Sequence, residues 1–164
     1  MHRSAIAALA ALAAFWTAPA AAAGISTETA IGHYCEPLAT GASLAQVEAL
    51  ARKDGLEADI VAGQRVMRQD DLLVGLSESP RVCFVQAPAA MTRAQGFALV
   101  DAWAKRQAGA ARLAATVGPD GAPVRGWGVP ARRIALVASE RTTPAGPKVM
   151  SFILMPLPAG PAGR

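Results

Sequence analysis

The spacing of apolar side chains predicts two helices, each with the same start signal. Ser43 and Gln46 form one capping box, and apolar residues follow at helical intervals. Thr92 and Gln95 form the other capping box. The apolar stripe of this second helix consists of Phe97, Val100, Trp103 and Ala104. Asp101 lies off the stripe, so we expect its carboxylate to be solvated.

Short apolar runs bounded by turn residues predict strands. They occupy residues 71–76, 81–86, 113–117, 124–129, 134–139 and 149–155. The turn chemistry of residues 77–80, 118–121 and 142–147 joins neighbouring runs into hairpins. Residues 24–42 look irregular because Gly32, Pro37 and Gly41 interrupt them, and residues 56–70 have no clear pattern. Residues 107–117 could instead extend the second helix, because they are rich in alanine.

This order of elements predicts the α+β class, with helices and hairpins segregated along the chain. We expect a single compact domain over residues 24–156. It would hold one antiparallel sheet of about five to six strands and two helices, one of them packed on a sheet face. Residues 157–164, rich in Pro, Gly and Ala, are expected to form a flexible tail.

The first 23 residues have the pattern of a secretory signal peptide. A basic start is followed by an apolar run over residues 5–16 and by small residues that place cleavage between Ala23 and Gly24. The apolar run is too short to span a bilayer, and no later stretch is long enough. The sequence therefore predicts a periplasmic or secreted protein with no transmembrane segment after cleavage. An uncleaved membrane anchor is the alternative.

The charges are unevenly distributed along a chain with a net charge of +4. Residues 24–80 carry four basic and nine acidic side chains, whereas residues 81–164 carry eleven basic and three acidic ones. Such asymmetry can mark a surface for an anionic partner. The alternative is that the two halves neutralise each other in the folded protein. Nucleic-acid binding is not expected, because no basic stripe is interleaved with aromatic residues.

Cys35 and Cys83 are the only cysteines, and in an exported chain they are expected to form a disulfide. His33 lies two residues before Cys35, so a thiol–imidazole site is the alternative. A structural zinc site needs four nitrogen or sulfur ligands, more than the mature chain supplies. The sequence predicts no metal and no cofactor.

The most unusual short motif is Gly126-Trp127-Gly128. Glycines inside a strand indicate a bulge or a close approach by another group. Arg125 and Trp127 share one side of this strand, and Arg132 and Arg133 lie at the start of the next one. If these four side chains face outward, they form a stacking and anion-binding site for a partner. The alternative is that Trp127 packs in the core.

No catalytic constellation is evident, so we predict a non-enzymatic binding or accessory domain of the cell envelope. Its partner would be an envelope protein or an anionic ligand. One alternative is an enzyme of unrecognised type that uses acidic residues such as Asp70, Asp71 or Glu78 in a cleft. Another is a structural subunit of an envelope assembly.

Overall fold

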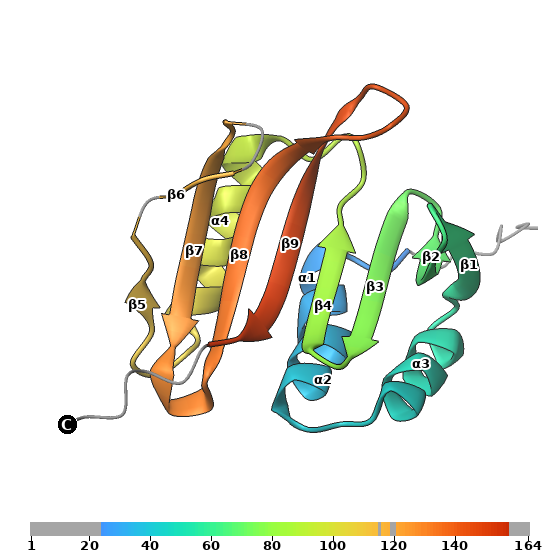
Figure 1. The fold of residues 1–164 in the computed structure, drawn as a ribbon, viewed down its shortest axis with the longest axis horizontal. Coiled ribbons are helices and arrows are strands. Elements are labelled where there is room, and N and C mark those ends of the chain that lie inside the picture. The colour runs from blue at the N-terminus through green and yellow to red at the C-terminus, as the bar shows by residue number, and fades with distance from the viewer. Residues whose placement is uncertain (1–23, 115, 119–120, 158–164) are drawn as a thin grey trace, which may run out of the picture.

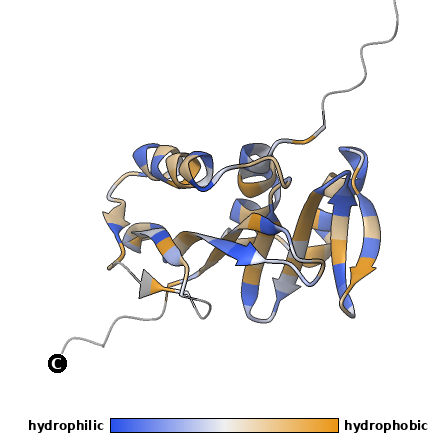
Figure 2. Cartoon of the chain, turned by 90° about the horizontal axis from the view of Figure 1, so that it is seen from above, coloured by the Kyte–Doolittle hydropathy of each residue, from blue (hydrophilic) through white to orange (hydrophobic). Residues whose placement is uncertain are grey.

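The computed structural model describes residues 24–114, 116–118 and 121–157, which form one antiparallel sheet with helices along one side (Figure 1; Figure 2). The helical elements are α1 (Thr27–Ala30), the π-helical turn η1 (Ile31–Cys35), α2 (Glu36–Thr40), α3 (Leu44–Lys53), α4 (Arg93–Lys105) and the 3-10 turn η2 (Pro130–Arg132). The strands are β1 (Glu57–Val61), β2 (Gln64–Gln69), β3 (Leu72–Glu78), β4 (Arg81–Gln86), β5 (Ala111–Arg112), β6 (Thr116–Val117), β7 (Pro123–Val129), β8 (Ile134–Thr142) and β9 (Lys148–Pro156).

The sheet consists of two meanders that meet in its middle. Eight strands follow the order β1-β2-β3-β4-β9-β8-β7-β5, and β6 also pairs with β7. The first half of the chain thus builds one half of the sheet and the second half builds the other. Among the described strands, only β4 and β9 join them, with Cys83 opposite Leu154 and Phe84 opposite Ile153.

The α+β class and the antiparallel sheet are confirmed, but the predicted number of elements is wrong. The nine described strands exceed the expected five to six, because residues 57–69 form the hairpin β1–β2 and residues 111–117 contribute two very short strands. Both predicted capping boxes are present, at Ser43 of α3 and Thr92 of α4. Helix α4 ends at Lys105 and does not extend into residues 107–117.

A third helical segment, α1-η1-α2, occupies residues that looked irregular in sequence. Pro37 directly follows the wider π-helical turn η1, in which the Glu36 N–H donates to the Ile31 carbonyl, five residues back. Gly32 faces open space, and Gly41, with a φ of 128°, ends the segment. The buried residues of the segment recur at helical intervals: Ile31, Tyr34, Cys35 and Leu38. That spacing outweighs the apparent breakers.

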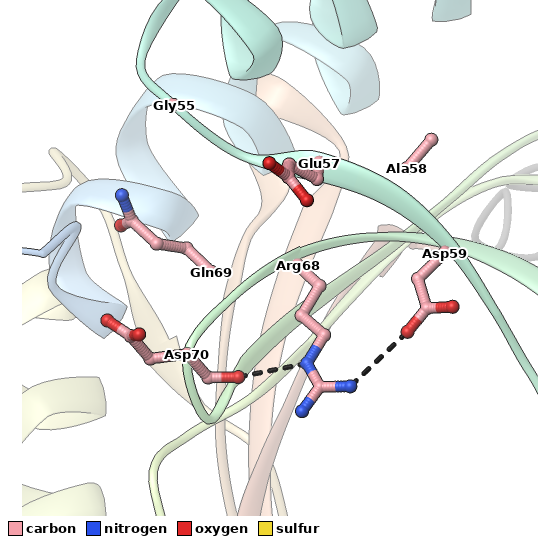
Figure 3. Close-up of a pocket in the computed structure, with 7 residues that line it drawn as sticks. All are labelled: Gly55, Glu57, Ala58, Asp59, Arg68, Gln69 and Asp70. Atoms are coloured by element: carbon pink, nitrogen blue, oxygen red, sulfur yellow. Dashed lines mark hydrogen bonds and ion pairs between the residues drawn. The ribbon is translucent and has the colours of Figure 1, made fainter.

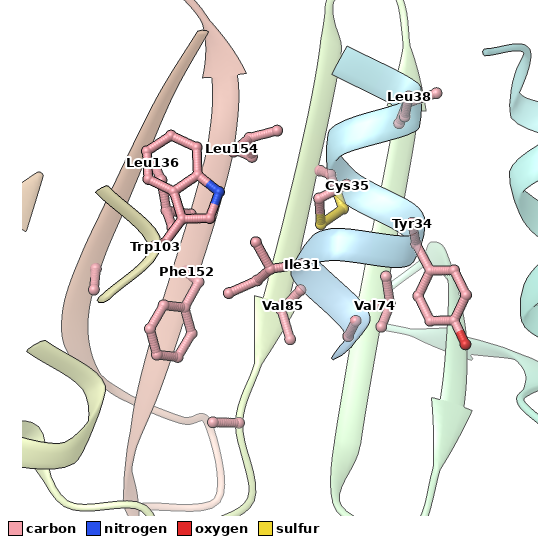
Figure 4. Packing of buried hydrophobic residues seen from close by; sticks show 14 of the residues in the cluster. Ile31, Tyr34, Cys35, Leu38, Val74, Val85, Trp103, Leu136, Phe152 and Leu154 are labelled. Carbon is pink, nitrogen blue, oxygen red and sulfur yellow. A yellow bond between two sulfur atoms is a disulfide. The ribbon is translucent and has the colours of Figure 1, made fainter. Parts of the chain in front are cut away.

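The core lies between the helices and the sheet face toward which they pack (Figure 4). The α1-η1-α2 segment contacts β4 and β9, while α4 contacts β7 and β8. Trp103 is buried, and its indole N–H donates to Glu36 Oε1 at 2.8 Å. Helix α4 therefore lies across the sheet face as predicted, with Val100 and Trp103 buried and Phe97 partly buried.

A disulfide and a tyrosine hydrogen bond also attach the N-terminal helical segment to its surroundings. Cys35 and Cys83 form a buried disulfide between η1 and β4, as predicted, so neither thiol is free for chemistry with His33. The Tyr34 hydroxyl donates to Asp54 Oδ2 at 2.9 Å, and burial together with this carboxylate raises the pKa of Tyr34. These contacts connect the segment to the sheet and to the end of α3.

The predicted signal peptide, residues 1–23, lies outside the described residues, as does the predicted tail except for Leu157. Leu157 is ordered against the sheet, because its N–H donates to the Arg133 carbonyl at 2.8 Å. None of the helices formed by the described residues has the length and apolar character needed to cross a membrane.

We expect the double variant Cys35→Ala/Cys83→Ala to unfold more easily than the native protein. The disulfide closes a loop across a sequence separation of 48 residues, for which the chain-entropy treatment gives about 4 kcal/mol of stabilisation. Urea denaturation should show a loss of about 2–4 kcal/mol. Reduced native protein is the control and should unfold like the variant. A difference below about 0.5 kcal/mol would show that the crosslink does not restrict the unfolded chain.

Candidate functional site

The sheet face opposite the helices, which we call the open face, is the main candidate site. Side chains alternate along each strand, so the neighbours of the core residues point to this face. Strand register aligns Gly75, Phe84, Ile153, Val137 and Gly126 in one row across five strands. No helix in the described part of the chain packs on this row.

The open face of the four central strands is almost free of charge. Beside the aligned row it presents Leu73 and Ser77 of β3, Val82 and Gln86 of β4, Val149, Ser151 and Met155 of β9, and Ala135 and Ser139 of β8. Arg141, at the end of β8, is the one charged residue that this alternation places on the face. Its guanidinium has no hydrogen bond or ion pair with another described residue. Val149, Ser151, Ala135 and Ser139 are buried on this face, whereas Phe84, Ile153 and Val137 are partly exposed.

Polar groups converge on a cavity of about 320 Å³ at one end of this face. Gln64, Gln86 and Arg141 line it, together with the apolar Phe84 and Ile153. The cavity wall also includes Thr143, whose Oγ1 is buried without a hydrogen-bond partner among the described residues. An apolar floor with a few unsatisfied polar groups is typical of a ligand-binding surface.

Two smaller features shape the open face. A Cβ atom at Gly75 would lie 2.2 Å from the Phe84 ring, so the ring can lie flat on β3 only because position 75 is glycine. Leu113 and Leu157 similarly cover Gly126 and Gly128, at 3.1 and 3.2 Å from their Cβ positions. The register of β7 with β8 is continuous, so the glycines of the Gly-Trp-Gly motif mark a close approach and not a bulge.

The predicted binding residues Arg125 and Trp127 lie on the helix side of β7, where both contact Asp101 of α4. Arg125 Nη1 is 2.7 Å from Asp101 Oδ2, and the Trp127 indole N–H donates to Asp101 Oδ1 at 2.9 Å. The Arg125 guanidinium also lies 4.9 Å from the centre of the Phe97 ring. The expectation that Asp101 is simply solvated is wrong, because its carboxylate connects α4 to β7.

The surrounding groups lower the pKa of Asp101. Partial burial raises the pKa of its carboxyl, but the hydrogen bonds from Trp127 and Arg125 and the charges of Arg125 and Arg112 lower it by more. The net result is a pKa below the ordinary value of 3.8. The side chains of Asp101 and Arg125 are about one third exposed, so this is a partly solvated ion pair.

The other two predicted binding residues are separated from this pair. Arg132 Nη1 contacts Glu36 Oε2 at 2.8 Å and Gln107 Oε1 at 2.6 Å. Arg133 is exposed, with a left-handed φ of 52°. Three of the four predicted side chains, those of Arg125, Trp127 and Arg132, therefore form contacts within the protein. Partner binding by the set stays a prediction.

The carboxylates named for an unrecognised enzyme do not all share one cleft. Asp70 lines a surface cavity of about 490 Å³ with Glu57, Asp59 and Arg68 (Figure 3). Asp70 and Asp71 both line a second surface cavity, whose wall also includes Arg68, whereas Glu78 lies apart from them in the β3–β4 hairpin. Among the described residues, no three His, Cys, Asp or Glu side chains lie close enough together to hold a metal ion.

Comparison with known protein families, with curated proteins and with solved structures finds no match to this chain.

We expect Gly75→Ala to disturb the open face. The new methyl group would displace the Phe84 ring from β3, at a cost of about 1–3 kcal/mol measured by thermal or urea denaturation. Gly32→Ala is the matched control, since nothing lies within 4 Å of its Cβ position and it should stabilise the helical segment slightly. If both variants changed stability equally, the glycine at 75 would have no packing role.

We expect Asp101→Asn to lower stability by about 1 kcal/mol at pH 7, because it removes a charge-assisted hydrogen bond. The folded pKa of Asp101 is depressed, so its contribution is present above about pH 3.8 and is lost as pH falls through the folded pKa. Urea midpoints measured against pH should therefore converge with those of the native protein in acid. Asp71→Asn, at an exposed position, is the control. A gap that persists in acid would contradict this account.

Proposed function

We propose that this protein is an exported, non-enzymatic binding domain that holds an extended segment of an envelope protein on its open face. The uncharged, partly exposed apolar face of strands β3, β4, β9 and β8 carries this proposal. A sheet face of this kind gains free energy when apolar area is removed from water. The buried disulfide is consistent with an oxidising compartment.

The shape and chemistry of the open face favour a polypeptide over a small molecule. Its cavities are surface depressions that share lining residues, such as Gln86 and Val149, and so form one elongated surface, which reaches the charged residues Arg68, Asp70 and Asp71 at its far end. The side-chain amides of Gln64 and Gln86 and the hydroxyl of Thr143 can pair with peptide N–H and C=O groups. The apolar floor at Phe84 and Ile153 can accept apolar side chains of such a segment.

Charge complementarity points to an acidic residue or a terminal carboxylate in that segment. Arg141 lies at the end of the open face, has no described partner and lines the same cavity as Gln86. A guanidinium binds a carboxylate with two parallel hydrogen bonds. The expected partner is therefore an apolar, extended segment with one carboxylate placed to reach Arg141.

The test is site-specific photo-crosslinking in cells that express the full-length chain. A photoreactive residue at Ile153 should give one discrete adduct, whose partner is identified by mass spectrometry as an envelope protein. Ile60 is the matched control, since it is 65% exposed on the edge strand β1, away from the open face. Arg141→Glu should reduce the adduct about ten-fold or more, because like charges would then oppose each other.

The variant Arg133→Glu distinguishes binding on the open face from binding at the Arg125–Arg133 region, which the sequence predicted. It also reverses an exposed arginine charge, but on the β7–β8 connection. Loss of the adduct with Arg133→Glu and its retention with Arg141→Glu would move the binding site to the Arg125–Arg133 region. An equal adduct from Ile60, or none from Ile153, would overturn docking on the open face.

A further inference from the structure

The first described residue lies against the acidic cavity formed at β1 and β2. The Ile25 N–H donates to Gln69 Oε1 at 2.6 Å, which fixes the chain next to the β2–β3 turn. A Cβ atom built on Gly24 would lie 3.5 Å from Gln69 Oε1 and 3.6 Å from Asp70 Oδ2. Standard backbone dimensions then place the Gly24 nitrogen within roughly 6 Å of the Asp70 carboxylate.

This cavity carries more negative charge than its own arginine neutralises. Glu57, Asp59 and Asp70 line it, and Arg68 is the only cationic side chain among the described residues that line it (Figure 3). Arg68 Nη1 contacts Asp59 Oδ2 at 3.3 Å, and its Nε donates to the backbone carbonyl of Asp70. The side-chain carboxylates of Glu57 and Asp70 therefore have no partner among the described residues.

We propose that signal-peptide cleavage creates the missing cation, and that the new α-ammonium group of Gly24 binds in this cavity and pairs with Asp70. The step is hydrolysis of the Ala23–Gly24 peptide bond by a signal peptidase. One water is consumed, Ala23 gains the carboxylate, and Gly24 gains the ammonium group. The precursor holds only a neutral peptide N–H at this position, so the pairing belongs to the mature protein alone.

The inference rests on the proposed export of the protein, but not on the open face as a docking surface. The acidic cavity is not the only observation behind it, because the Ile25–Gln69 hydrogen bond also holds Gly24 beside Asp70. An opposite charge at this range favours the charged form of both groups. The pairing should therefore raise the pKa of the α-amino group above its usual range of about 7.7–8.0.

The pH dependence of the folding stability follows from the upward direction of this pKa shift. A group whose folded pKa is raised contributes stability that is fully present below its unfolded pKa and is lost as pH rises through the folded value. The charged groups that line the cavity are Glu57, Asp59, Arg68 and Asp70. Comparing chains with a free and an acetylated amino group isolates the contribution of Gly24 to any change in stability between pH 7 and pH 9.

The experiment compares chains that begin at Gly24 with a free or an acetylated amino group, each with Asp70, with Asp70→Asn or with Asp71→Asn. Residue 70 has a left-handed φ of 51°, which asparagine also tolerates, so the substitution keeps the backbone. NMR of ¹⁵N-labelled Gly24 gives the pKa of the α-amino group. Urea denaturation gives the folding equilibrium constant.

The proposal expects an α-amino pKa that is raised in the native and Asp71→Asn chains and returns to the usual range in Asp70→Asn. Acetylation should lower the folding equilibrium constant about 1.5- to 5-fold at pH 7 when Asp70 is present, the range of partly exposed ion pairs. It should have no such effect in Asp70→Asn. An unshifted α-amino pKa, or an acetylation effect of the same size in the native and Asp70→Asn chains, would overturn the pairing.

Mass spectrometry of the chain recovered from its own cells keeps this failure separate from failure of export. A mature mass that begins at Gly24 with an unshifted pKa refutes the pairing and leaves export intact. An uncleaved mass, or cleavage at another residue, refutes the proposal at its first step.

Discussion

Strands β4 and β9 pair over four residues, and within the described part of the chain this short ladder is the only strand pairing between the two halves of the sheet. The contact brings residues 81–86 and 148–156 together across a long stretch of chain, so its loop-closure entropy must be offset by what surrounds it. The α1-η1-α2 segment lies over the junction and contacts both strands. The disulfide from Cys35 to Cys83 attaches that segment to β4 at the junction itself.

The uneven charge of the sequence is partly used to hold the two halves together. Glu28 and Glu36 belong to the acidic first half, and they form ion pairs with Arg106 and Arg132 of the basic second half, at 2.7 and 2.8 Å. These pairs are partly exposed, so each contributes modestly to stability. They favour the interpretation that the halves neutralise each other, and they explain why Arg132 is already engaged within the molecule.

The two faces of the sheet have different relations to water. The helix face is closed by apolar packing and by the polar contacts of Trp103 and Asp101, each of which gives a buried or half-buried donor its acceptor. The open face instead holds Phe84 against Gly75 and leaves Phe84, Ile153 and Val137 partly exposed. This difference is the physical basis for placing a partner on the open face and not beside Asp101.

The sequence alone determined the features that depend on local chemistry. The capping boxes at Ser43 and Thr92 and the hairpins β3–β4 and β8–β9 could be predicted because neighbouring residues encode them. The Cys35–Cys83 pairing followed from having two cysteines and an export pattern. The helical segment at residues 27–40 was also encoded in its buried spacing, but Pro37 and Gly32 obscured it.

The tertiary structure decided which surfaces those elements expose. Which side of β7 faces α4 depends on how the sheet packs, so the engagement of Arg125 and Trp127 by Asp101 could not be predicted from strand alternation. The open face arises because β4 pairs with β9, which aligns Phe84, Ile153 and Val137 from distant parts of the chain. The position of Gly24 beside Asp70 also depends on contacts between distant parts of the chain. Contacts between residues far apart in sequence depend on the packing of whole elements, and no local pattern specifies them.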